Sequence, residues 1–109
     1  MFLYFLECTS KNRRKSYYTG IANNIERRLN QHRSGTGSRY TRGKKIKMFF
    51  HVSVNKSAIY KIETRLKKPK NQLYKKSLIE DIKRMRKEGV DEELIQYEIL
   101  DSMCEILLD

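Results

Sequence analysis

The sequence has few cysteines and no long hydrophobic run, and each shortage excludes a class of protein. Its two cysteines, Cys8 and Cys104, are too few for a disulfide scaffold, and the two histidines do not complete a zinc site with them. The longest apolar run, Met1–Leu6, is too short to span a membrane and lacks the basic start of a signal peptide. We therefore expect a reduced, cytoplasmic protein with no membrane partner.

Basic residues are absent from the last part of the chain and concentrated in the rest. Residues 1–88 hold all 24 Lys and Arg and six acidic residues, a net charge of +18, whereas residues 89–109 hold the other seven acids, a net charge of −7. A body this basic favours a polyanionic partner, above all nucleic acid, because phosphate contacts release counterions. The alternative is a basic protein that its charge merely keeps in solution.

The hydrophobic pattern predicts one mixed α/β (α+β) domain with a single modest core, in a chain of 109 residues of which 39% are apolar. A small three-stranded antiparallel sheet flanked by helices is expected, in the order β-β-α-β-α followed by two C-terminal helices. Asn23 with Glu26 indicates a helix start, Pro69 a helix end and Gly89 a helix stop. The predicted strands are 2–6, 16–21 and 46–53, and the predicted helices end near His32, Lys68, Lys87 and Leu108.

The glycine-rich stretch from Ser34 to Lys45 fits no phosphate-binding loop. Five residues separate Gly37 from Gly43, where that motif has four, and Lys45 stands where it needs Ser or Thr. No nucleophile elbow or zinc-finger spacing is present either. The chemistry left to the chain is built from tyrosine, arginine and glutamate.

These residues occur in an order that resembles the GIY-YIG nuclease superfamily. Phe2-Leu3-Tyr4 and Tyr18-Thr19-Gly20 stand where that family has its two triplets, followed by Arg28 and by Glu63 in the second helix. The chain is most similar to small single-domain members related to the catalytic module of the UvrC excision nuclease, over roughly residues 1–80. Both triplets depart from the family pattern but keep the tyrosine, and the second keeps its final glycine.

The resemblance implies a metal-dependent endonuclease that nicks DNA, in which Tyr4 or Tyr18 is the base and Arg28 clamps the phosphate. Glu63 would bind Mg²⁺ (or Mn²⁺), which takes carboxylate and phosphate oxygens. Glu63 also has an alternative, an ion pair with Lys67 one turn on.

Three further expectations concern the predicted catalytic set, to which His32 also belongs. His32, one turn after Arg28, either assists proton transfer, contacts phosphate or is an ordinary histidine at a helix end. If the hairpin register brings their faces together, Tyr4 and Tyr18 meet over one patch. Gly20 would let the substrate backbone approach that patch.

Other residues are predicted to track the nucleic-acid backbone from the loop and hairpin, with one tyrosine able to stack on a base. Residues 1–88 are expected to form the nuclease domain, and residues 89–109 an acidic helix packed on it or on a partner, as a monomer or homodimer. RNA stays open as a substrate, as does a noncatalytic nucleic-acid-binding module. A role in DNA repair or recombination is expected, at the nucleoid if the source is bacterial or archaeal. The predicted binding residues are Arg13, Arg14, Arg27, Arg39, Tyr40, Arg42, Lys44 and Lys45.

Overall fold

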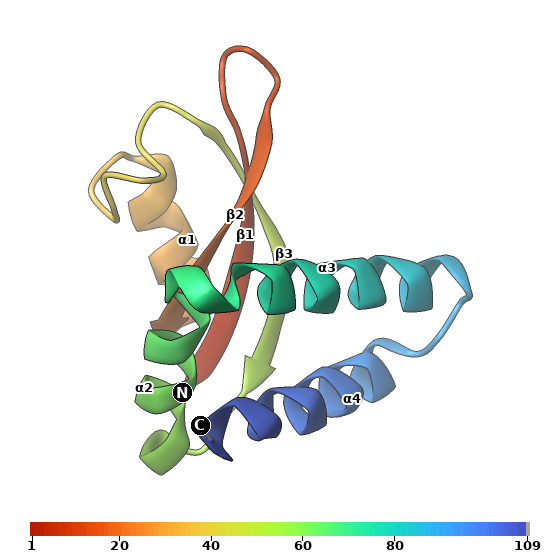
Figure 1. Ribbon diagram of the computed structural model, residues 1–109. Helices are drawn as coiled ribbons and strands as arrows, with labels where there is room; N and C mark the ends of the chain where they lie inside the picture. Colours follow the sequence, from red (N-terminus) through yellow and green to blue (C-terminus); the bar gives the residue numbers. More distant parts are fainter. Residues whose placement is uncertain (109) are drawn as a thin grey trace. The chain divides into compact units, whose positions relative to one another are not determined.

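The computed structural model describes residues 1–108, which contain a three-stranded antiparallel sheet and four α-helices (Figure 1). The mixed α/β class and the predicted order of elements are confirmed. The chain divides into two compact units, residues 1–55 and residues 56–109. Each unit is described below by itself.

The first unit is built on the strands β1 (Phe2–Thr9), β2 (Lys15–Ala22) and β3 (Lys45–Ser53), in the order β2-β1-β3. The central strand β1 pairs antiparallel with both neighbours, and a register shift between Phe5 and Leu6 interrupts its pairing with β3. Its side chains are buried on both faces, as its continuous apolar sequence predicts. β1 is therefore a rigid base for any residue that projects from it.

Helix α1 (Ile25–Arg33) packs on one face of this sheet. Ile25 and Leu29 contact the cluster that includes Tyr4 and Leu6, and α1 lies alongside the strands in Figure 1. The helix begins one residue later than expected, because Asn24 rather than Asn23 is its cap. Asn24 itself has an extended backbone, and its side chain accepts a hydrogen bond of 3.0 Å from the backbone N–H of Arg27.

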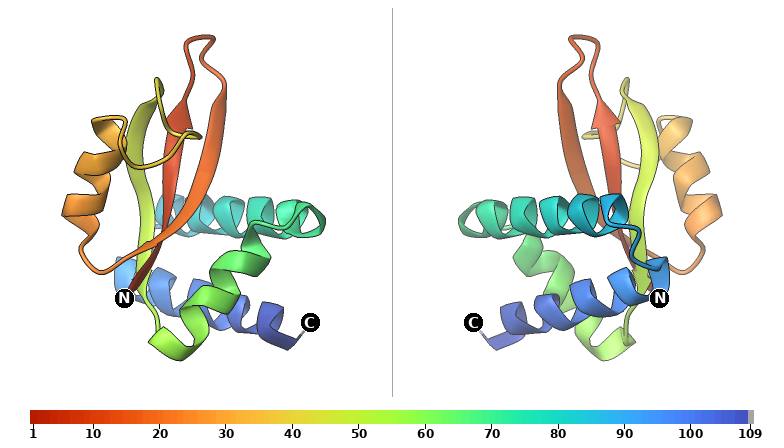
Figure 2. Two further views of the ribbon diagram at one scale, coloured as in Figure 1. Left: turned by 90° about the vertical axis from the view of Figure 1, so that its left-hand side faces the viewer. Right: turned by 90° about the vertical axis from the view of Figure 1, so that its right-hand side faces the viewer.

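The second unit contains α2 (Lys56–Leu66), the 3₁₀ helix η1 (Pro69–Asn71), α3 (Gln72–Lys87), α4 (Glu92–Cys104) and a terminal 3₁₀ helix, η2 (Glu105–Leu108). Helices α3 and α4 lie side by side and are joined by a turn at Gly89 (Figures 1 and 2). The Tyr74 hydroxyl donates to the Ser102 carbonyl at 2.6 Å, which ties α3 to α4.

Two helix ends differ from the sequence prediction for local reasons. α2 ends at Leu66 rather than Lys68, because a residue before proline avoids the helical region, and Lys68 is indeed extended. The last helix stops at Cys104 and tightens into the 3₁₀ turn of η2. Neither difference alters the order of elements.

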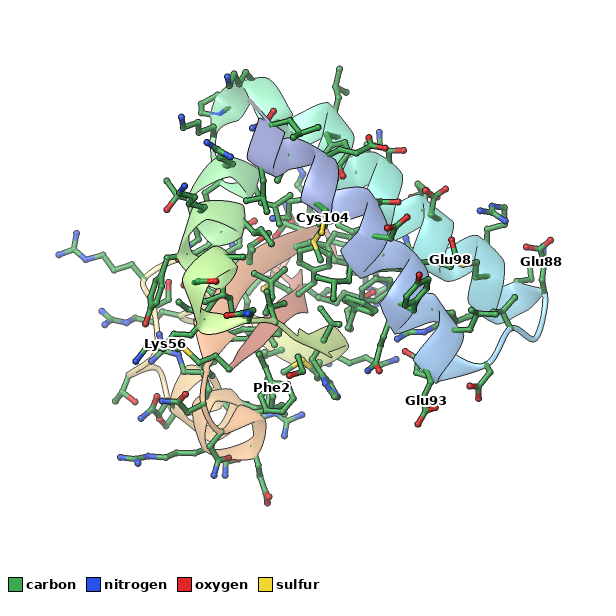
Figure 3. All side chains as sticks on the ribbon, turned by 90° about the horizontal axis from the view of Figure 1, so that it is seen from below. Phe2, Lys56, Glu88, Glu93, Glu98 and Cys104 are labelled. Carbon is green, nitrogen blue, oxygen red and sulfur yellow. The ribbon has the colours of Figure 1, made fainter. Side chains whose placement is uncertain are left out.

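The acidic residues of the α3–α4 hairpin lie on its surface. Glu88 and Glu93 point outward at the end where the two helices are joined (Figure 3). Ile95, Ile99 and Met103 of α4 are buried, so the apolar side of this helix is committed to packing. The negative charge is therefore presented by a folded helix. In the described part of the chain, no helix is long and apolar enough to cross a membrane.

Thr19 of β2 generates a prediction about stability. Its side chain is 1% exposed, and its hydroxyl has no hydrogen-bond partner among the described residues. A buried hydroxyl without a partner costs about 1–3 kcal/mol, so Thr19→Val, which keeps the shape, should raise the free energy of unfolding by about 1 kcal/mol. Urea unfolding measures the change. Thr64→Val, at an exposed helix position, is the matched control and should have almost no effect; a Thr19→Val protein less stable than wild type would contradict the prediction.

Candidate active site

Two tyrosines from neighbouring strands share the sheet face that α1 covers. The register pairs Tyr4 with Gly20 and Leu6 with Tyr18, so both tyrosines project from the same face. Their ring centroids are 6.4 Å apart. Tyr4 is 1% exposed, whereas Tyr18 is only partly buried. The predicted meeting of the two phenols over one patch is therefore what the structure shows.

Helix α1 supplies the next two side chains, one turn apart. The Arg28 Nε lies 3.4 Å from the Tyr4 hydroxyl, and its Nη1 donates to Gln31 at 3.0 Å. His32 is 1% exposed and its Nε2 lies 2.8 Å from the Tyr4 hydroxyl. The i, i+4 spacing places both groups over the sheet, and the cap at Asn24 sets where the helix begins.

The second nitrogen of His32 is also occupied. Its Nδ1 lies 2.9 Å from the hydroxyl of Thr41, a buried residue in the loop after α1. The Thr41 hydroxyl donates in turn to the Ser38 carbonyl at 3.2 Å. His32 is thus held on both sides of its ring, while it also stands in the last turn of α1.

The pKa values of the two basic groups in this cluster are shifted in opposite directions. Hydrogen bonding to Tyr4 raises the pKa of Arg28 above its ordinary value and outweighs the opposing effect of burial. Burial, and then the nearby Arg28 charge, lowers the pKa of His32. The arrangement therefore keeps a permanent cation and a neutral imidazole on the same phenol at neutral pH.

Two glycines are needed because side chains of the site fill the space a Cβ would occupy. A Cβ on Gly20 would overlap the phenol ring of Tyr4. A Cβ on Gly37 would lie 2.7 Å from His32 Nδ1 and 2.9 Å from its Cγ. Gly20 therefore leaves room for Tyr4, and the expectation that it also lets the substrate backbone approach stays a prediction.

The hairpin tip and the loop after α1 lie at the same end of the sheet (Figure 2). Residues of these two segments line a basic groove. It encloses about 560 Å³, and the lining includes Lys11, Arg14, Tyr40 and Lys44. The Lys44 ammonium lies 3.8 Å from the centre of the Tyr40 ring, so a nucleic-acid base that stacked on that side would displace it. The groove brings together three of the predicted binding residues.

The other predicted binding residues are exposed. Arg13, at the hairpin tip, has the positive φ of 64° that a tight turn requires. Arg27 lies on the outer side of α1, beside the shallow hollow that Asn24 and Gln31 also line. The remaining exposed members of the set are Arg39, Arg42 and Lys45.

Glu63 lies on α2 in the second unit and forms an ion pair with Lys67 at 3.2 Å. The alternative weighed from the sequence is therefore present in the structure. Among residues 1–108 no group of three or more His, Cys, Asp or Glu side chains is arranged to hold a metal. A single carboxylate still fits Mg²⁺, which keeps several waters and takes its other ligands from a substrate phosphate.

Sequence reasoning missed Thr41, Gly37 and Gln31. All three occur in or next to the polar stretch that is predicted to be a loop. That stretch has other threonines and glycines, and its sequence does not distinguish these residues from them. Nothing in the local pattern marks Thr41 as buried or assigns it to His32, nine positions earlier. Only the path of the loop back over α1 reveals these contacts.

Comparison with known proteins gives a family match. A family model described as the GIY-YIG catalytic domain matches residues 1–77 of the chain. That range includes Tyr4, Tyr18, Arg28, His32 and Glu63. No solved structure matches the chain.

Several curated proteins are similar to the chain, all under the name UPF0213 protein. The one from Oceanobacillus iheyensis is 40% identical over 68 residues, 61% of this chain and 74% of the relative. The one from Pectobacterium carotovorum is 42% identical over 67 residues, 59% of this chain and 66% of the relative. The one from Nitratidesulfovibrio vulgaris is 51% identical over 43 residues, which span 39% of this chain but only 36% of the relative.

The lowered pKa of His32 predicts how stability depends on pH. Because the folded pKa lies below the ordinary value of 6.5, the unfolded chain binds more protons once the pH falls below that value. The free energy of unfolding should therefore have its full value above about pH 6.5 and should decrease as the pH falls below that value. Urea unfolding at several pH values measures this. His32→Gln should lose part of the decrease and His51→Gln, at the other histidine of the chain, should retain it; equal pH profiles for the two variants would rule out His32 as the source.

Proposed function

Because this chain belongs to the GIY-YIG catalytic domain family, we propose that it is a metal-dependent endonuclease that nicks DNA. The observation that carries the proposal is the position of the Tyr4 hydroxyl between Arg28 Nε, at 3.4 Å, and His32 Nε2, at 2.8 Å. A phenol with a pKa near ~10 is a poor base in water. The neighbouring Arg28 cation stabilises its ionised form, and His32 Nε2 is placed to take up its proton.

We favour Tyr4 over Tyr18 as the base, since its hydroxyl already contacts a nitrogen that can accept its proton. The attacking water meets the Tyr4 hydroxyl beside Arg28, which is partly exposed. The water oxygen bonds to phosphorus as the bond to the leaving 3′ oxygen breaks. The proton of the water passes to Tyr4, whose own proton passes to His32 Nε2, and the leaving oxygen is protonated by solvent.

Arg28 and Tyr18 have supporting roles in this scheme. The guanidinium of Arg28 stays charged at any working pH and binds a nonbridging phosphate oxygen through its free donors. The partly exposed Tyr18 hydroxyl lies beside it and orients the phosphate or the water. Tyr4→Phe should therefore reduce cleavage more than Tyr18→Phe.

The metal requirement is assigned from the family order of residues. We propose Glu63 as the carboxylate that binds Mg²⁺ or Mn²⁺, with Lys67 released from its ion pair when the metal binds. Such an ion would polarise the scissile phosphate and stabilise the leaving oxygen. We also retain residues 1–88 as the nuclease domain and residues 89–109 as its acidic segment, which packs on the domain or forms a homodimer. DNA repair or recombination, in the cytoplasm, is the setting that best suits such an enzyme.

Nicking of supercoiled plasmid, with Mg²⁺ or Mn²⁺ and with EDTA, tests the proposal. Wild type should convert the plasmid to open circles only with metal. Arg28→Ala should reduce the rate at least about 10²-fold, since a charged clamp on a transition state contributes on that order, and Glu63→Gln should also abolish most of the nicking. Arg33→Ala on α1 and Glu80→Gln on α3 are the matched controls.

Two outcomes of this experiment would count against an enzyme. Wild type that binds DNA without nicking it under any metal would favour the noncatalytic binding module. Equal nicking by wild type and by the Arg28 and Glu63 variants would point to a contaminating nuclease. RNA of the same length, tested in parallel, decides which nucleic acid is preferred.

Binding through the basic groove predicts a specific salt dependence. Each phosphate contact contributes roughly one unit to the slope of log affinity against log salt. Arg14→Ala and Lys44→Ala should each lower that slope by about 1 without changing sequence preference. Fluorescence anisotropy with labelled DNA at several salt concentrations measures it. Lys47→Ala is the control, because Lys47 alternates with Ile46 and Met48 and so faces the opposite side of the sheet. If Lys47→Ala lowered the slope as much as the other two variants, binding could not be assigned to the groove.

A further inference from the structure

The hydrogen bonds through Tyr4 and His32 form one chain. One end of this chain can only donate a hydrogen bond, and the other end can only accept one. At one end, a guanidinium N–H can only donate, and Arg28 Nε contacts the Tyr4 oxygen. At the other end, a backbone carbonyl can only accept, and Ser38 receives the Thr41 hydroxyl proton at 3.2 Å. The ends therefore determine the direction of every bond between them.

The direction follows step by step from the Ser38 end. A hydroxyl has one hydrogen, so when Thr41 donates to Ser38 it meets His32 only as an acceptor. His32 Nδ1, at 2.9 Å, must then carry the ring proton. In a neutral imidazole the other nitrogen is left with a lone pair, and Nε2, at 2.8 Å, accepts from the Tyr4 hydroxyl.

We propose that Thr41 is a positioning residue that holds His32 in the Nδ1–H tautomer, the form whose Nε2 can receive the Tyr4 proton. The inference rests on the proposed function, in which that transfer accompanies attack by water. Without Thr41 the ring could carry its proton on Nε2 instead, and it would then donate to the Tyr4 oxygen and leave the phenol proton no acceptor on His32.

The position of Thr41 suits this task. Its side chain is 1% exposed, so solvent does not compete for the hydroxyl. Gly37, four residues before, packs directly against the ring of His32, which limits rotation of the imidazole. The same loop has a second threonine, Thr36, whose hydroxyl bonds to Ser34 and the Gln31 carbonyl and not to His32. The chain thus offers its own matched control.

The experiment combines a spectroscopic readout with kinetics. The chain has two histidines, so a long-range ¹⁵N–¹H spectrum of the ¹⁵N-labelled protein contains two imidazole patterns, and His51 reports whether the fold is intact. Wild type should show His32 protonated at Nδ1 and bare at Nε2. Thr41→Val should shift His32 toward the other tautomer and Thr36→Val should not, while Thr41→Ser, which keeps the hydroxyl, should restore the wild-type pattern.

Nicking rates complete the test. Thr41→Val should lower kcat by roughly 10- to 100-fold, as loss of a partner that orients a functional histidine does, with KM for DNA unchanged within about twofold. Thr41→Ser should recover most of the rate. An Nε2–H tautomer in wild type, or a Thr41→Val protein with the wild-type tautomer and rate, overturns the proposal. Absence of nicking by wild type while the tautomer responds to Thr41→Val overturns the proposed function alone and leaves the positioning role supported.

Discussion

The hydrogen bond between the Tyr4 hydroxyl and His32 Nε2 is the contact on which the first unit depends. It joins the central strand β1 to helix α1 across 28 residues of sequence, inside a face where both groups are almost fully buried. A buried hydroxyl and a buried imidazole are each costly without a partner, so the sheet and the helix must meet in one orientation. Gly20 and Gly37 are both required by that orientation, because each leaves room for one of the two rings.

The same constraint explains how polar groups coexist with an apolar face. Leu6, Ile25 and Leu29 pack in the same apolar cluster as Tyr4. Arg28 remains partly exposed at its edge, where its charge is available to an anion while its Nε contacts the phenol. A low local dielectric strengthens each of these hydrogen bonds, so the cluster is rigid and also electrically polarised.

Positive and negative charge gather on different elements of the chain. The hairpin tip and the loop after α1 present Arg14, Lys44 and their neighbours around one groove, which concentrates their positive charge there. The acidic end of the chain is a regular helix whose apolar side is buried and whose carboxylates point outward. Its negative charge is thus a property of a folded element.

Much of the architecture could be predicted because local patterns are strong. Continuous apolar residues in Phe2–Leu6 predicted a strand buried on both faces, and periodic isoleucines and leucines predicted the helices. Boundary errors occur at element ends, for example where Asn24 caps α1, Pro69 shortens α2 and the last helix stops at Cys104. The order of Tyr4, Tyr18, Arg28 and Glu63 was enough to indicate the family. The shared face of the two tyrosines followed from strand alternation once the hairpin was paired.

The sequence by itself determined the elements, the division of charge and the family, because each of these is encoded in neighbouring residues or in their spacing. Only the tertiary structure decided that Tyr4 contacts His32, that Thr41 closes the other side of the ring, and that Gly37 makes room for it. These are contacts between a strand, a helix and an irregular loop. No periodicity encodes them, since a loop's path depends on the packing it completes rather than on its own composition.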